Sequence, residues 1–95
     1  MVGKVRDDLQ GIPGVGPAIA TDLRGIGMRE VADLRGRNAE RLYDALCRRT
    51  GRKVDRCVLY VFRCAVYFAS EQRHDPQLLR WWNWQDRPRG RRHSR

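Results

Sequence analysis

Two glycines flanking one apolar residue, with a proline directly behind them, constrain the fold of this 95-residue chain more than any other feature. The segment is Gly14-Val15-Gly16-Pro17. Glycine can adopt positive φ and lets another backbone come close, and proline suits the first turn of a helix because no N–H donor is needed there. The pattern therefore predicts a tight hairpin that leads into a helix from about Pro17 to Arg24, with Gly25 ending it.

The start of this predicted helix is a candidate site for an anion. The first N–H groups of a helix have no partner within it, and the helix dipole places partial positive charge at the same end. Such an end can hold a phosphate whatever the base sequence, so we expect contact with a nucleic-acid backbone there. The candidate nucleic-acid-binding residues are Gly14, Val15, Gly16, Pro17, Ala18 and the nearest arginine, Arg24. The alternative is that the hairpin serves packing or docks a protein.

The residues around the hairpin resemble a helix-hairpin-helix element, a common unit of sequence-independent DNA binding. The resemblance rests on Ile12-Pro13-Gly14-Val15-Gly16, Ala20, Leu23, Gly25-Ile26-Gly27 and Val31-Ala32-Asp33-Leu34. The last two segments look like the following helix of such modules in repair polymerases. DNA-binding hairpins of this kind often carry lysine just after the glycines. This chain has Ala18 and Thr21 there, with Asp22 nearby, so the protein-docking alternative stays open.

A larger part of the chain, about residues 5–86, resembles the small bacterial pathogenicity-locus family of helix-hairpin-helix proteins. The resemblance rests further on Leu42-Tyr43, on the run from Asp55 to Ala69, and on Trp81-Trp82-Asn83-Trp84. Some members of this family carry the label mitomycin-resistance protein. The resemblance implies an all-α fold and constrains the fold more than the function. For a DNA-binding protein of this size we expect an accessory role in DNA repair or stress tolerance.

Helical spacing of apolar residues runs through the chain, without the alternation of a strand. We expect an all-α, compact bundle of five or six short helices, with an N-terminal helix-hairpin-helix and one long buried helix. Besides the helix after the hairpin, the expected helices are one from about Val5 to Gln10, Met28 to Leu34, Ala39 to Thr50 capped by Asn38, Arg56 to about Gln72 capped by Asp55, and a short one after Asp75-Pro76.

The long helix from Arg56 is apolar on nearly every side, which predicts that it is buried and that Phe62 lies in the core. One stripe differs, because spacings of three and four residues place several polar and aromatic side chains on one face. The stripe consists of Arg56, Tyr60, Arg63, Tyr67 and Glu71. It is either an ordinary solvent face or a partner face, since alternating arginine and tyrosine suits protein interfaces and stacking on bases.

The net charge of +9 is unevenly distributed. Five of the twenty basic residues are arginines in the last nine positions, which leaves +4 on the rest of the chain. We expect one domain over residues 1–86 and a disordered arginine-rich tail over 87–95. A basic chain attracts nucleic acid, although charge also serves solubility. The tail is a candidate second anchor on DNA through Arg87, Arg89, Arg91 and Arg92.

Cysteines and tryptophans give weaker signals. Cys47, Cys57 and Cys64 include no CxxC pair, and His74 and His93 lie far from them, so we expect buried reduced thiols and no metal. Among Trp81, Trp82 and Trp84 we expect at least Trp81 or Trp82 to pack on the core and one to stay exposed. The alternative for the tryptophans is stacking on bases.

No catalytic constellation is visible: the sequence has no carboxylate pair, no nucleophile beside a histidine and no phosphate loop. We expect a non-enzymatic protein without cofactor or small-molecule substrate. The N-terminus shows no export signal and the longest apolar run is too short for a bilayer, so a cytoplasmic protein without membrane contact is expected. Two functions remain open, weak sequence-independent DNA binding or a protein-interaction adaptor that kept the hairpin without binding DNA.

Overall fold

A computed structural model describes residues 8–85 of the chain. That part is helical and contains no strand. Its α-helices are α1 (Pro17–Gly25), α2 (Ala39–Thr50) and α3 (Arg56–Ser70), and its 3-10 turns are η1 (Asp8–Gly11), η2 (Val31–Leu34), η3 (Pro76–Leu79) and η4 (Trp81–Trp84). The all-α expectation is confirmed. The expectation of five or six helices is wrong, because three α-helices and short 3-10 turns make up the described part.

The two longest helices begin and end where local side chains dictate. The Asn38 side chain accepts a hydrogen bond from the Arg41 N–H at 3.1 Å and caps α2, and Gly51 ends α2 with φ of 75°. The Asp55 carboxylate caps α3 by accepting from the Cys57 N–H at 2.9 Å. These limits are as predicted, except that α3 ends at Ser70 and not near Gln72.

The helix expected from Met28 to Leu34 is only the turn η2. Gly27 has φ of 96°, which breaks the chain direction, and the Asp33 carboxylate accepts from the N–H groups of Arg29 and Glu30 at 3.0 and 3.1 Å. These donors therefore bond a side chain, and the helical turn begins only after Glu30. The start of the helix expected from Val5 lies outside the described residues, and its end is the turn η1.

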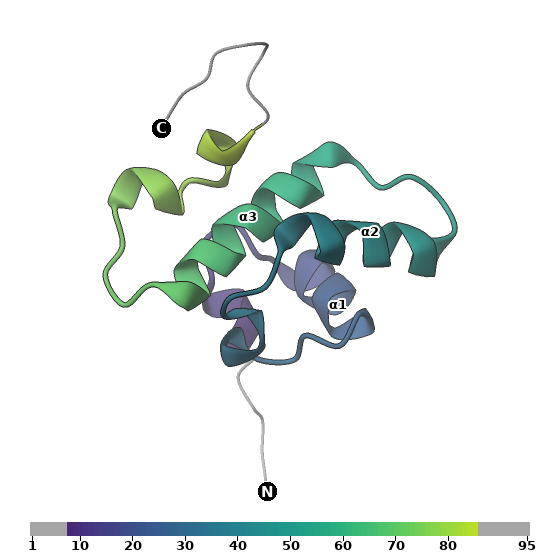
Figure 1. The fold of residues 1–95 in the computed structure, drawn as a ribbon, viewed down its shortest axis with the longest axis horizontal. Helices are drawn as coiled ribbons and strands as arrows, with labels where there is room; N and C mark the ends of the chain where they lie inside the picture. The colour runs from purple at the N-terminus through teal and green to yellow at the C-terminus, as the bar shows by residue number, and fades with distance from the viewer. Residues whose placement is uncertain (1–7, 86–95) are drawn as a thin grey trace, which may run out of the picture.

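Helix α3 passes through the middle of the molecule, with α1, α2 and η2 on one side and η3 and η4 on the other (Figure 1). Phe62 is fully buried, as predicted. The expectation that α3 is buried on nearly every side is wrong. Val66, Phe68 and Ala69 are half-buried and Cys57 is exposed, because the short turns of the C-terminal segment cover the helix only in part.

Candidate nucleic-acid interface

The hairpin is a β-turn fixed to the core on both sides. The Val15 N–H donates to the Ile12 carbonyl at 3.0 Å, and the side chains of both residues are buried. Pro13 and Gly14 occupy the centre of the turn, and Gly14 has φ of 87°. Proline followed by a glycine of positive φ is the pattern of a type II turn, so Gly14 is required here by backbone geometry.

Helix α1 begins directly after this turn, and it lacks the side-chain cap that both α2 and α3 have. Gly16 occupies the capping position with φ of −95° and provides no side-chain cap, and the first turn has no acidic residue. The first helical bond runs from the Ala20 N–H to the Gly16 carbonyl at 2.9 Å. The N–H groups of Ala18 and Ile19 come before that bond, and Pro17 and Ala18 are exposed. This end of α1 is therefore suited to an anion.

Two residues predicted for the site do not contribute as expected. The Val15 N–H is used inside the turn, so it is not a donor for a phosphate. Arg24 lies in the last turn of α1, where its guanidinium donates to the Thr21 hydroxyl at 3.3 Å. Seven residues of helix separate Arg24 from Pro17, which is about 10 Å along the axis. Arg24 therefore does not reinforce the start of α1.

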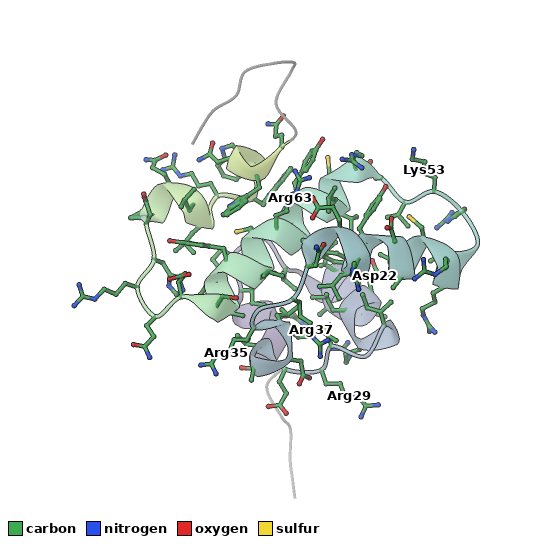
Figure 2. All side chains as sticks on the ribbon, viewed as in Figure 1. Asp22, Arg29, Arg35, Arg37, Lys53 and Arg63 are labelled. Atoms are coloured by element: carbon green, nitrogen blue, oxygen red, sulfur yellow. The ribbon has the colours of Figure 1, made fainter. Side chains whose placement is uncertain are left out.

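Other arginines gather at a place that the sequence analysis did not single out. Arg29, Arg35 and Arg37 flank the turn η2 and lie along the lower edge of the view in Figure 2. Arg37 is held there by a hydrogen bond from its Nε to the Asp33 carbonyl at 2.9 Å. The same Asp33 has its carboxyl pKa lowered, first by the N–H groups of Arg29 and Glu30. The spacing of three arginines around a short turn was the signal available in the sequence.

The predicted partner face on α3 is largely occupied by the chain itself. The Arg63 guanidinium binds the Glu40 carboxylate at 2.6 and 3.1 Å and donates to the Trp84 carbonyl at 2.8 Å. The Tyr67 hydroxyl accepts from the Asp75 N–H at 2.7 Å. The prediction that the whole stripe is a solvent or partner face is therefore wrong for Arg63 and Tyr67. They fasten the C-terminal segment to α3.

Two arginines of the same stripe lie over tyrosine rings. The Arg56 guanidinium lies 5.7 Å from the centre of the Tyr43 ring, and the Arg63 guanidinium lies 5.8 Å from that of Tyr60. Tyr43 also donates a hydrogen bond to the Val54 carbonyl, which fixes the loop between α2 and α3. Arg56 and Tyr60 of the stripe therefore also contact other parts of the same chain.

The chain's relatives are known at the level of a family. The model of the family described as Pathogenicity locus matches residues 4–90, nearly the whole chain. The chain belongs to the pathogenicity locus family. The searches of curated proteins and of solved structures give no match. The expected resemblance to the pathogenicity locus family is therefore confirmed.

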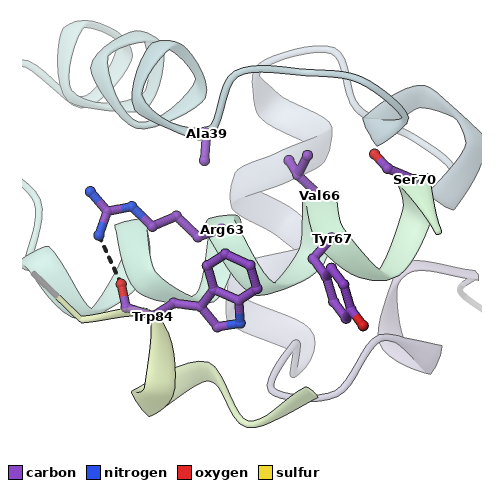
Figure 3. A pocket seen from close by; sticks show the side chains of 6 residues that line it. All are labelled: Ala39, Arg63, Val66, Tyr67, Ser70 and Trp84. Carbon is purple, nitrogen blue, oxygen red and sulfur yellow. Dashed lines mark hydrogen bonds between the residues drawn. The ribbon is translucent and has the colours of Figure 1, made fainter. Parts of the chain in front are cut away.

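A shallow pocket of about 260 Å³ opens beside Arg63 (Figure 3). Ala39, Val66 and Ser70 lie on one side of it, and Arg63, Tyr67 and Trp84 lie on the other. Apolar atoms make up almost all of its lining. No local sequence pattern predicts the pocket, because its walls come from α2, α3 and η4, which are distant in sequence.

The tryptophans divide as expected between packing and exposure. A Cβ placed on Gly14 would lie 2.9 Å from Cδ1 of Trp81, so Trp81 packs directly on the hairpin. Trp84 is half-buried and donates from its indole N–H to the Leu78 carbonyl at 2.8 Å. Trp82 is 48% exposed, the only large apolar side chain in residues 8–85 that is exposed.

The cysteines differ from one another in burial. Cys64 is buried, and burial raises the pKa of its thiol to about 11. Cys57 is exposed at the start of α3, so the expectation that its thiol is buried is wrong. Within the described residues no three His, Cys, Asp or Glu side chains are grouped so as to hold a metal, and no helix there is long and apolar enough to cross a membrane. The tail arginines Arg87, Arg89, Arg91 and Arg92 lie outside the described residues.

Proposed function

We propose that this pathogenicity locus protein is a non-enzymatic helix-hairpin-helix protein that binds DNA independently of sequence. The observation that carries the proposal is the start of α1, which follows a glycine turn, has no side-chain cap and has no acid in its first turn. α2 and α3 are both capped by a side chain. An N-terminus left without a cap can donate its N–H groups to a phosphate oxygen.

The proposed binding is weak and depends on salt. No basic side chain lies in the first turn of α1, where Ala18 is exposed, so a single phosphate contact by backbone N–H groups carries the interaction. We expect dissociation constants of the order of 10⁻⁴ to 10⁻⁶ M, with the arginines of residues 87–95 as the second anchor. Such an accessory role suits DNA repair or stress tolerance in the cytoplasm.

A charge placed at the start of α1 tests the proposal. Ala18→Asp puts a carboxylate next to the expected phosphate and weakens DNA binding about ten-fold, because like charges repel. The same acid stabilises a helix N-terminus by about 0.3–1 kcal/mol, so lost binding cannot be attributed to unfolding. Ala18→Lys strengthens binding. Ala32→Asp is the matched control, since Ala32 is exposed but lies in η2 beside Arg35.

The titration uses duplex and single-stranded DNA of unrelated sequences at two salt concentrations. The logarithm of the affinity falls with the logarithm of salt at about −0.9 per duplex phosphate contacted. Deleting residues 87–95 flattens this slope if the tail touches phosphates. The proposal fails if Ala18→Asp binds as the wild type does, and loss with Ala32→Asp alone would move the interface to η2.

The second candidate function is a protein-interaction adaptor, and the apolar pocket beside Arg63 favours it. A pocket of about 260 Å³ lined by Val66 and Trp84 has room for one large apolar side chain of a partner. This alternative predicts that a synthetic peptide of residues 86–95 binds DNA as well as the whole protein. In that case the hairpin is not a DNA site, and the pocket becomes the place to look for a partner.

A further inference from the structure

We propose that Trp82 is a stacking platform for an unpaired base, so that the DNA bound at the hairpin is single-stranded. This inference rests on the proposed function and specifies its ligand. It starts from the exposure of Trp82 next to two tryptophans of the same turn that are packed. Nearly half of the Trp82 side chain stays in water and forgoes the stabilisation that burial of so large an apolar surface gives, and residues 8–85 cover only the remainder.

The turn that carries Trp82 is held firmly. The Trp84 indole N–H donates to the Leu78 carbonyl at 2.8 Å, and the Asn83 side-chain amide donates to the Gln77 carbonyl at 2.7 Å. From the other side, Arg63 donates to the Trp84 carbonyl at 2.8 Å. The turn that carries Trp82 is therefore tied to α3 and η3, and the Trp82 ring contacts the Trp81 ring. Ordering before binding reduces the entropy lost when a flat ligand stacks on the ring.

Trp81 connects this ring to the hairpin. On one side it packs against Gly14, and on the other its ring meets that of Trp82 edge to face, with centres 5.7 Å apart and planes at 86°. The Trp82 ring thus lies one side chain away from the turn that leads into α1. The proposal places on this ring a base next to the phosphate that binds at the start of α1.

Charge favours a nucleic acid over an apolar partner at this ring. Residues 87–95, which begin five positions after Trp82, contain five arginines and no acidic residue. The described residues 8–85 themselves carry thirteen basic and nine acidic side chains. An aromatic ring followed in the sequence by basic residues is typical of proteins that bind single strands, in which rings stack on bases and basic side chains contact the backbone.

Stacking on the Trp82 ring favours single-stranded DNA over a duplex, because only unpaired bases have free faces. In a duplex each base is stacked on both sides, so an exposed indole can meet only a groove or the end of the helix. Stacking is also independent of base identity, since every base has a π-face. The proposed ligand is therefore single-stranded DNA of any sequence, preferred over a duplex at equal charge.

The test compares Trp82→Leu with Trp82→Phe in the full-length chain. The probes are a dT oligonucleotide and a duplex of unrelated sequence, titrated at two salt concentrations. Trp82→Leu keeps an apolar side chain but removes the aromatic face, and it weakens dT binding by about five-fold or more. Trp82→Phe retains most of the affinity. The salt slope stays the same in both variants, because no phosphate contact is changed.

Fluorescence provides a second readout, since stacking of a base on an exposed indole quenches its emission. We expect dT to quench the wild type, and we expect most of that quenching to be absent in Trp82→Leu. Equal dT affinity in wild type and Trp82→Leu would overturn the stacking inference while leaving DNA binding intact. Equal losses for dT and duplex would overturn the single-strand preference. A wild type that is dimeric where Trp82→Leu is monomeric would make Trp82 a self-association contact and overturn it too.

Failure of the underlying function gives a different result. If the wild type binds neither probe better than a peptide of residues 86–95, the hairpin is not a DNA site and the inference about Trp82 falls with it.

Discussion

The indole ring of Trp81 lies against Gly14 so closely that even a methyl group at Gly14 would come 2.9 Å from Cδ1 of the ring. Gly14 also has φ of 87°, a conformation that other residues rarely adopt. The hairpin therefore needs its first glycine for two independent reasons. One belongs to the turn itself, and the other belongs to a side chain from the opposite end of the domain.

Gly14→Ala is expected to destabilise the protein by about 1–2 kcal/mol from the positive φ alone, with a further cost from the contact with Trp81. Gly16→Ala is the matched control, because Gly16 has φ of −95° and a Cβ there meets nothing within 4 Å. The free energies of unfolding in urea give the comparison. Equal effects at the two glycines would contradict this account of the hairpin.

Phe62→Ala is expected to cost about 3–5 kcal/mol, because the Phe62 ring is fully buried where α3 meets the elements around it. Val66→Ala is the control on the same helix, since Val66 is half-buried at the edge of the pocket and its loss leaves a smaller cavity. Thermal unfolding followed by circular dichroism measures both variants. A change below about 1 kcal/mol for Phe62→Ala would show that α3 is packed by a different face.

Glu40 gives a prediction for pH. The hydrogen bond from Arg63 is the main cause that lowers the pKa of the Glu40 carboxyl below its ordinary value of 4.5. A lowered pKa in the folded state means that the pair stabilises the protein above about pH 4.5 and that this stabilisation is lost as the pH falls through the folded pKa. The Glu40 side chain is 57% exposed, so the contribution is at most about 1 kcal/mol.

Glu40→Gln should therefore lower the free energy of unfolding near pH 7 and leave it nearly unchanged near pH 3. Urea unfolding of wild type and variant across this range measures the difference. The same substitution at the exposed Glu71 controls for the change in net charge. A difference between wild type and Glu40→Gln that stays constant with pH would count against the ion pair.

The cysteines should react with thiol reagents in a fixed order. Cys64 is buried with a thiol pKa of about 11, so in the native state at pH 8 it reacts slowly and becomes reactive in denaturant. Cys57 is exposed and reacts first, although desolvation and the nearby Asp55 carboxylate also raise the pKa of its thiol. Mass spectrometry over a time course assigns the sites, with Cys57→Ser as the control. Equally fast labelling of Cys64 would place it at the surface.

The sequence predicts best what neighbouring residues determine. The caps Asn38 and Asp55 and the terminator Gly51 act within a few residues, so the limits of α2 and the start of α3 followed from them. The turn η2 was mistaken for a helix because its backbone donors bond the Asp33 side chain, which apolar spacing does not reveal. Short segments form helices only with tertiary support, so packing decides their form.

The candidate site divides in the same way. The turn at Gly14 and the start of α1 could be predicted, since both depend on glycine and proline at adjacent positions. The covering of Gly14 by Trp81, the Arg63 contacts and the pocket join segments far apart in the chain, and no local pattern encodes them. The stripe on α3 was recognised as unusual, but its partner is the C-terminal segment of the same chain.

The contact between Trp81 and Gly14 has a consequence for biosynthesis. Trp81 lies 67 positions after Gly14, so a nascent chain emerging from the ribosome exposes the hairpin long before the ring that covers it is made. Domains generally fold as units during synthesis. The hairpin is therefore covered only after translation has passed Trp81, and shorter fragments lack the covering ring. An interaction that needs the hairpin with Trp81 packed against it is possible only in chains that contain both segments.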